Sequence, residues 1–184
     1  MGVHILEKAA KVQKGQRWLK RVTAEMGGKD AIIVDSSADI DAAVEGIVTS
    51  AFGFSGQKCS ACSRVIVLAD VYDQIVEGVV ARTKEVISVG SGLEGAASMG
   101  AVVDQNQYDS INDYIEIGKK EAKLVYQGEV PDTNGFYVPP TIFAGAAATS
   151  RIACEEIFGP VLTIVKVDSY DEALAVVNDS EYGL

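Results

Sequence analysis

The sequence predicts an α/β protein. Apolar residues switch repeatedly between helix-like and strand-like spacing, and short β-branched runs alternate with longer amphipathic stretches. The 184 residues, 48% of them hydrophobic, are enough to bury a core. We find no internal repeat, no low-complexity tract and no linker, so we expect a single domain over residues 1–184.

The first half of the chain is expected to begin with a helix and then to alternate between strands and helices. Each element follows from its apolar spacing. In order, they are a helix over 5–12 that ends near Gly15, an extended stretch over 20–25, a strand over 31–34, a helix over 40–51, a strand over 64–69 and a helix over 72–86. Ser37 and Asp39 are the N-cap candidates for the helix that begins at residue 40.

The second half continues this alternation after a glycine-rich loop. In order, we expect that loop over 90–100, a helix around 108–115, a segment over 123–126, a strand over 161–167 and a helix around 173–177. Asn134-Gly135 predicts a turn. Pro139-Pro140 lack the backbone N–H that a central strand donates, so we expect the segment after them to be an edge strand or no strand.

Charge and composition argue against several classes of function. Lys and Arg total 16 against 26 Asp and Glu, a formal net charge of −10 that disfavours binding to nucleic acid or to a membrane surface. No apolar run approaches the roughly 18 residues of a membrane span, and the first residues do not resemble a signal peptide, so we expect a cytoplasmic protein. Three cysteines disfavour a disulfide framework, and one histidine disfavours a histidine-based metal site, so we expect no metal.

Cys59 and Cys62 form a C-x-x-C pair, a pattern typical of redox dithiols and of half of a zinc site. Zinc would need further ligands, and the third cysteine, Cys154, lies far along the chain. A thioredoxin-like pair would follow a strand and begin a helix, whereas this pair follows a helical run and precedes a strand. A single nucleophile, Cys59, held after the flexible Gly56, agrees better with the pattern, and Cys62 and Cys154 can be small buried side chains.

Residues 90–95 match the dinucleotide fingerprint G-x-G-x-x-G, whose glycines let a pyrophosphate approach a helix N-terminus. That motif needs a strand before it and a helix after it. Here the end of a helix precedes Gly90, and residues 96–100 are a poor helix start, so we interpret the match as a plain loop.

Three carboxylates stand beside turns that could orient them. Glu25 precedes Gly27-Gly28 at the end of an extended segment, and loops at strand ends often carry catalytic groups. Glu155 and Glu156 precede a compact run over 157–160, which would orient one of the two reproducibly. A lone carboxylate is usually a solvated surface group, so these positions alone do not assign a role.

Three separated motifs, taken in order, resemble the signature of the NAD(P)-dependent aldehyde dehydrogenase superfamily. They are Glu-Met-Gly-Gly-Lys over 25–29, Gly-Gln-Lys-Cys over 56–59 and Glu-Glu-Ile-Phe-Gly-Pro over 155–160. The stretches over 16–22 and 52–64 resemble the branch that oxidises glutamate γ-semialdehyde in proline breakdown, the 1-pyrroline-5-carboxylate dehydrogenases. The resemblance runs through essentially the whole chain and implies a twisted, mainly parallel sheet flanked by helices.

The resemblance also implies a role for five side chains and NAD as the cofactor. Cys59 matches the nucleophile that attacks the aldehyde carbon, passing through a thiohemiacetal to a thioester. Glu25 matches the general base that activates water to hydrolyse this thioester. Glu156 matches the carboxylate that binds the nicotinamide-ribose hydroxyls, and Phe158 the aromatic residue beside the nicotinamide ring. Ser60 is a candidate hydrogen-bond donor to the carboxylate of the substrate.

Members of this family are much longer than this chain. The resemblance therefore implies that residues 1–184 are most of a catalytic domain, without the coenzyme-binding half and the C-terminal end. It further implies a homo-oligomer for the full-length enzyme and no appreciable turnover for the isolated chain. Three alternatives stay open: a thiol–disulfide oxidoreductase that uses Cys59 and Cys62, an aldehyde dehydrogenase of another specificity, and a non-catalytic binding remnant.

Overall fold

The computed structural model describes residues 1–95 and 97–183, and these form a five-stranded sheet with the order β1-β2-β5-β4-β3. The strands are β1 (Ala31–Val34), β2 (Arg64–Leu68), β3 (Lys123–Gln127), β4 (Thr141–Ala144) and β5 (Val161–Val167). The pairs β1–β2, β2–β5 and β5–β4 are parallel, whereas β3 runs antiparallel to β4. The predicted α/β class with a mainly parallel sheet is confirmed.

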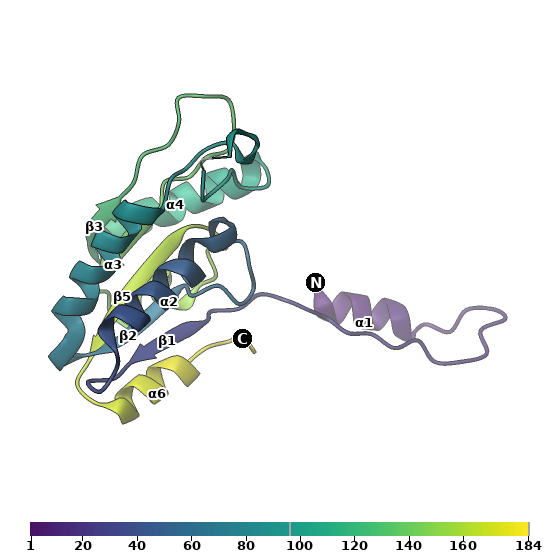
Figure 1. Cartoon of the computed structure of the whole chain (residues 1–184). Helices are drawn as coiled ribbons and strands as arrows, with labels where there is room; N and C mark the ends of the chain where they lie inside the picture. The colour runs from purple at the N-terminus through teal and green to yellow at the C-terminus, as the bar shows by residue number, and fades with distance from the viewer. Residues whose placement is uncertain (96, 184) are drawn as a thin grey trace.

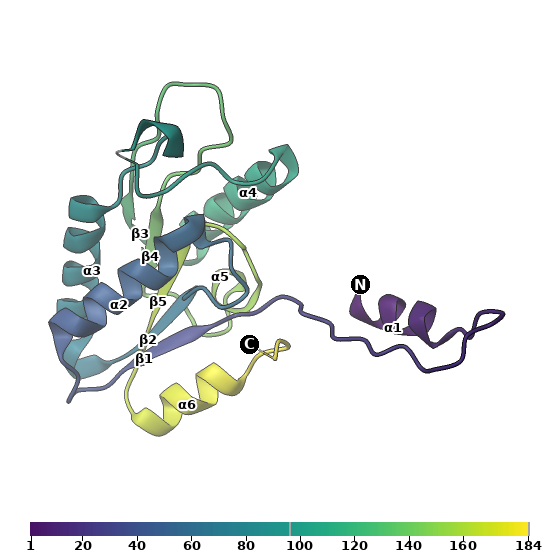
Figure 2. The same ribbon diagram turned by 45° about the vertical axis from the view of Figure 1, so that its right-hand side comes forward.

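Helices cover both faces of this sheet (Figures 1 and 2). α2 (Ile40–Phe52) and α3 (Tyr72–Val86) pack on one face, and α4 (Gln105–Glu121), α5 (Arg151–Cys154) and α6 (Tyr170–Asn178) pack on the other. Successive side chains of a strand point to opposite faces, so Val65 and Val67 enter the core under α2 and α3, whereas Ile66 enters the core under α4 and α6. The sequence pattern did not predict the short helix α5.

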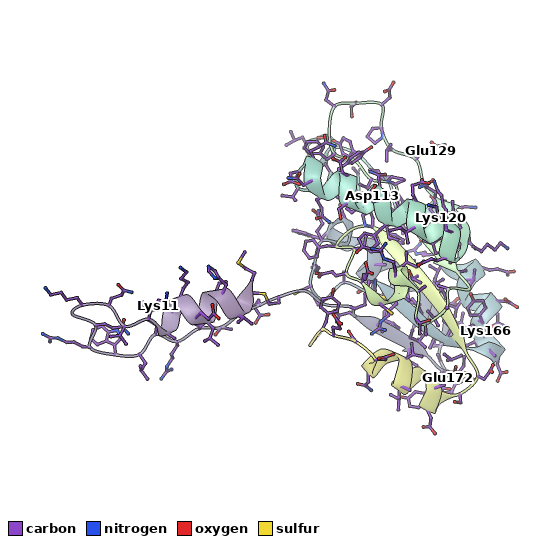
Figure 3. All side chains as sticks on the ribbon, turned by 180° about the vertical axis from the view of Figure 1, so that it is seen from behind. Lys11, Asp113, Lys120, Glu129, Lys166 and Glu172 are labelled. Carbon is purple, nitrogen blue, oxygen red and sulfur yellow. The ribbon has the colours of Figure 1, made fainter. Side chains whose placement is uncertain are left out.

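Polar side chains lie on the outer surfaces of these helices. Figure 3 views the molecule from behind, with α4 and α6 in front of the sheet; Asp113 and Lys120 of α4 and Glu172 of α6 are exposed there. Asp39 caps α2 by accepting a hydrogen bond from the backbone N–H of Ala42 at 3.0 Å. The predicted N-cap at Asp39 is therefore confirmed.

The expectation for the segment after Pro139-Pro140 is wrong. β4 lies between β5 and β3 in the interior of the sheet, and all four of its residues are buried. The two prolines precede the strand, whose first residue, Thr141, donates its N–H to the carbonyl of Pro160 at 2.9 Å. The two residues that lack a backbone N–H therefore lie before the hydrogen-bonded part of β4. The restriction on proline within central strands does not apply to them.

The first 26 residues, which we call the arm, extend away from the sheet (Figures 1 and 2). They contain α1 (Gly2–Ala10), which ends before the predicted stop near Gly15 and buries none of its residues. Val3, Trp18 and Leu19 of the arm are largely exposed. No helix among residues 1–95 and 97–183 is both long and apolar enough to cross a membrane.

Arg64, at the beginning of β2, fixes the segment that leads from the arm into the sheet. Its side chain is buried, and its Nε donates a hydrogen bond to the carbonyl of Lys29 at 3.0 Å. Its two terminal nitrogens donate to the carbonyls of Val176 and Val177 at 3.0 and 2.9 Å, at the end of α6. A buried guanidinium with three carbonyl acceptors thus joins the residues around Lys29 to β2 and α6.

Candidate active site

An open cleft of about 760 Å³ brings together side chains from distant parts of the sequence. The cleft contains every residue to which the sequence resemblance assigned a role. It is lined by Glu25, Met26, Gly27, Gln57, Lys58, Cys59, Ser60, Gln107, Glu156 and Phe158. Gln57 belongs to the second motif but received no role, and the sequence pattern did not single out Gln107, because an isolated glutamine carries no motif by itself.

Cys59 lies in a tight loop between α2 and β2. Phe54 and Ser55 both have φ of +58°, and Gly56 has φ of +68°, so three consecutive residues adopt left-handed backbone. The buried hydroxyl of Ser55 donates a hydrogen bond to the carbonyl of Gly100 at 2.9 Å, which anchors this loop. The strained loop ends the helical run and leaves Cys59 half-buried at the cleft wall.

The two cysteines of the C-x-x-C pair have different environments. Cys59 lines the cleft, whereas Cys62 is buried and its thiol donates a hydrogen bond to the carbonyl of Arg64 at 3.5 Å. Burial raises the pKa of the Cys62 thiol to about 12, so it stays protonated at neutral pH. A buried, protonated thiol is a poor partner in thiol–disulfide exchange, which disfavours the dithiol alternative.

The structure separates the adjacent carboxylates Glu155 and Glu156. Both oxygens of Glu155 accept hydrogen bonds from Arg151 at 2.8 Å, and Tyr114 donates to one of them at 2.6 Å. These bonds lower the pKa of Glu155 to about 2. Glu155 does not line the cleft described above, whereas Glu156 does. The position of the pair alone left the choice between them open, whereas the resemblance pointed to Glu156, and Glu156 is the one of the two that lies in the cleft.

Glu156 lines the cleft and is held by two hydrogen bonds. Its Oε1 accepts a hydrogen bond from the backbone N–H of Gly28 at 3.0 Å, and its own N–H donates to the hydroxyl of Tyr182 at 3.3 Å. A Cβ added to Gly27 would lie 2.2 Å from Oε2 of Glu156, so only glycine leaves room for the carboxylate. The glycine pair that follows Glu25 therefore accommodates the carboxylate of a residue more than a hundred positions away.

Glu25 and Phe158 complete the cleft as exposed side chains. Glu25 is contributed by the end of the arm, two residues before the glycine that contacts Glu156. Phe158 has φ of +55°, uncommon for a residue with a side chain, and its ring is exposed while the preceding Ile157 is buried. Ser60 is exposed beside the thiol and carries a hydroxyl that can donate to an anion.

Lys29, which follows the Gly27-Gly28 pair, is almost completely inaccessible, with 1% of its surface exposed. Within the described part of the chain, its Nζ has no hydrogen-bond partner. Burial and the positive charge of Arg64 lower the pKa of Lys29 to about 8, against a smaller opposing effect of Cys154 and Glu156. The sequence pattern gave Lys29 no role beyond its place in the first motif.

The fold and the cleft define an α/β protein that presents an accessible cysteine together with two carboxylates and an exposed aromatic ring. The model of the aldehyde dehydrogenase family matches residues 1–184, and the chain belongs to this family. The class predicted from the three motifs is confirmed.

Individual relatives agree with this membership. The 1-pyrroline-5-carboxylate dehydrogenase of Geobacillus kaustophilus is 55% identical over 184 residues, which are 100% of this chain and 36% of the relative. A Thermus 1-pyrroline-5-carboxylate dehydrogenase with bound NAD matches with a TM-score of 0.90 and 47% identity, over 100% of this chain and 35% of that one. Proline utilization A from Bdellovibrio bacteriovorus, inactivated by N-propargylglycine, matches with a TM-score of 0.93 and 48% identity, over 100% of this chain and 19% of that one. The chain thus spans about a third of the length of the curated relative.

Proposed function

We propose that the chain supplies the catalytic cysteine, the general base and the nicotinamide-facing residues of an NAD-dependent 1-pyrroline-5-carboxylate dehydrogenase. This enzyme oxidises glutamate γ-semialdehyde to glutamate in proline degradation. The observation that carries the proposal is the convergence of Cys59, Glu25, Glu156 and Phe158 on one cleft. Identity of 55% to a relative that bears this name supports the same substrate class.

The chemistry begins at Cys59. Once its proton has been taken up by a base, the sulfur attacks the aldehyde carbon, and the carbonyl oxygen becomes the hydroxyl of a thiohemiacetal. NAD, when bound, supplies the acceptor for the hydride that leaves this carbon. The hydroxyl gives up its proton as the hydride leaves, the C=O double bond re-forms, and the acyl group is held on the sulfur as a thioester. Glu25 takes a proton from a water molecule, the water oxygen forms the new bond to carbon, and the C–S bond breaks to release the acid and the thiolate of Cys59.

Glu156 and Phe158 fit the nicotinamide end of NAD. A carboxylate offers about four acceptor sites, and Gly28 donates to Oε1 of Glu156, so this carboxylate can accept further bonds from two ribose hydroxyls. Phe158 offers an exposed aromatic ring in the same cleft for contact with the planar nicotinamide. Because Gly27 has no side chain, the carboxylate of Glu156 can lie beside it at the cleft wall.

Substrate selection is assigned to the region around the thiol. The hydroxyl of Ser60 can donate to the carboxylate of the semialdehyde, which favours an acidic substrate over a plain alkyl aldehyde. We also propose that residues 1–184 form most of the catalytic domain of a cytoplasmic, homo-oligomeric enzyme. In this view the isolated chain lacks turnover, because the chain covers 36% of the relative's length.

A chimera tests this function directly. The corresponding segment of the Geobacillus kaustophilus enzyme is replaced by this chain, and NADH production is measured with pyrroline-5-carboxylate and with an alkyl aldehyde. We expect turnover with strong preference for pyrroline-5-carboxylate, and none from the 184-residue chain alone. A folded chimera that prefers the alkyl aldehyde would assign the chain to another aldehyde dehydrogenase specificity.

A further inference from the structure

Gln107 lies in the first turn of α4 and lines the cleft, yet the chemistry above gives it no role. Its Nε2 donates hydrogen bonds to the carbonyl of Ile157 at 3.0 Å and to the carbonyl of Phe158 at 2.9 Å. One side-chain amide therefore holds two consecutive carbonyl groups. Both belong to the turn that carries Glu156 and Phe158 into the cleft.

The turn needs such support because its backbone conformation is unfavourable. Phe158 adopts φ of +55°, a left-handed conformation in which an aromatic residue persists only when its surroundings hold it. The same turn buries Ile157 and exposes the ring of Phe158. Release of the two carbonyls would let Phe158 return to a commoner conformation and move its ring.

Gln107 is itself fixed by α4. Asp104 caps this helix and accepts a hydrogen bond from the backbone N–H of Gln107 at 2.9 Å. One turn further along, Ile111 is completely buried, and a Cβ added to Gly159 would lie 2.4 Å from its Cδ1. The helix that carries Gln107 therefore packs directly on the turn that the side chain holds.

The segment before α4 also contacts the nucleophile loop. The Oε1 of Gln57, two residues before Cys59, accepts a hydrogen bond from the backbone N–H of Val103 at 3.1 Å. Residues 103–107 thus contact the loop of Cys59 through Gln57 and the turn of Phe158 through Gln107. The two contacts use different side chains, so they can be removed separately.

We propose that Gln107 is a positioning residue, which by donating to the carbonyls of Ile157 and Phe158 fixes the turn that presents Glu156 and Phe158 to the nicotinamide end of NAD. The effect of Gln107 on the conformation of the turn can be tested in this chain by itself. Its effect on the binding of NAD rests on the proposed function.

Hydrogen–deuterium exchange on the 184-residue chain tests the first part. Gln107→Met keeps the length of the side chain but removes both donors, and we expect amides of residues 156–160 to exchange about tenfold faster. The matched control is Gln105→Met in the same helical turn, because Nε2 of Gln105 donates to Asp109 on the exposed side of α4 at 2.7 Å. Gln107→Lys, which keeps N–H donors, should restore slow exchange. Equal exchange in the two methionine variants would overturn the proposal.

Kinetics in the chimera test the second part. Gln107→Met should raise the KM for NAD about tenfold relative to Gln105→Met, while the alkylation rate of Cys59 by iodoacetamide without NAD stays unchanged. Faster exchange with an unchanged KM would overturn the role toward NAD and leave the proposed function intact. An inactive but folded chimera without the substitution would instead count against the proposed function, and the exchange measurement would still decide the role of Gln107 in the turn.

Discussion

Gly56 packs directly against the backbone of Gly159. A Cβ added to Gly56 would lie 2.2 Å from the carbonyl oxygen of Gly159, and φ of Gly56 is +68°. These two glycines bring the loop of Cys59 into contact with the turn that follows Phe158. The contact between the loop of Cys59 and the turn of Phe158 is therefore made by main chain, with no room for a side chain between them.

Gly56→Ala is expected to lower the free energy of unfolding by about 2 kcal/mol or more, because the methyl group meets backbone and the left-handed φ penalises alanine. Gly53→Ala is the matched control, since Gly53 has φ of −54° and its added Cβ meets nothing within 4 Å. Urea denaturation of the 184-residue chain measures both. Equal free energies of unfolding in the two variants would show that the loop of Cys59 and the turn of Phe158 can move apart without loss of stability.

Cys59→Ala in the chimera should abolish oxidation of pyrroline-5-carboxylate, whereas Cys62→Ser should retain most of it. Cys59 lines the cleft, and Cys62 is a buried thiol whose hydrogen bond to the Arg64 carbonyl a serine hydroxyl can replace. Steady-state NADH production is the measurement. Comparable losses in both variants would move the assignment to the dithiol chemistry.

Glu25→Gln should slow hydrolysis of the thioester about 10² to 10⁴-fold, because the substitution removes a base but keeps a side chain of similar shape. Formation of the thioester should then be much faster than its hydrolysis. Single-turnover kinetics should then show a burst of NADH followed by slow release of acid. Glu7→Gln in α1 serves as the control, since Glu7 is an exposed carboxylate elsewhere in the arm. Deacylation at the wild-type rate in Glu25→Gln would remove this residue from the role of base.

Lys29→Met should stabilise the chain in a pH-dependent way. The pKa of Lys29 is lowered to about 8 from 10.5, so the folded state loses this proton before the unfolded state does. Below pH 8 the buried ammonium carries its full penalty, about 3 kcal/mol for a shift of this size. As the pH rises from 8 to 10.5 this penalty disappears, so the free energy of unfolding of the wild type increases over this range.

The free energy of unfolding of Lys29→Met should therefore exceed that of the wild type at pH 7, and the excess should shrink toward pH 10.5. The Cys62 thiol, with its pKa raised to about 12 chiefly by burial, makes the folded state lose stability above pH 9. Both proteins carry this thiol, so most of the effect cancels in the difference, and only the smaller part that Lys29 itself exerts on the Cys62 pKa does not. Lys123→Met, at an exposed position of β3, is the control. An excess that stays constant from pH 7 to 10.5 would contradict the buried ammonium.

The local patterns predicted most elements because each element is encoded by neighbouring residues. The β-branched runs at β2 and β5 and the apolar faces of α2 and α3 lie where the periodicity placed them. The short α5 was not predicted, because four residues are too few to show a helical period. The interior position of β4 was predicted wrongly, because strand order depends on which strand pairs with which and not on the residues before the strand.

The sequence by itself determined the α/β class and the family, and it predicted Cys59 as the nucleophile, because local apolar spacing and short motifs are readable without knowledge of the contacts between them. Only the tertiary structure showed that Arg151 and Tyr114 hold Glu155 outside the cleft, that Cys62 is buried, and that Gln107 donates to the turn of Phe158. Each of these outcomes depends on contacts between residues far apart in the chain, and local spacing carries no information on which distant groups meet.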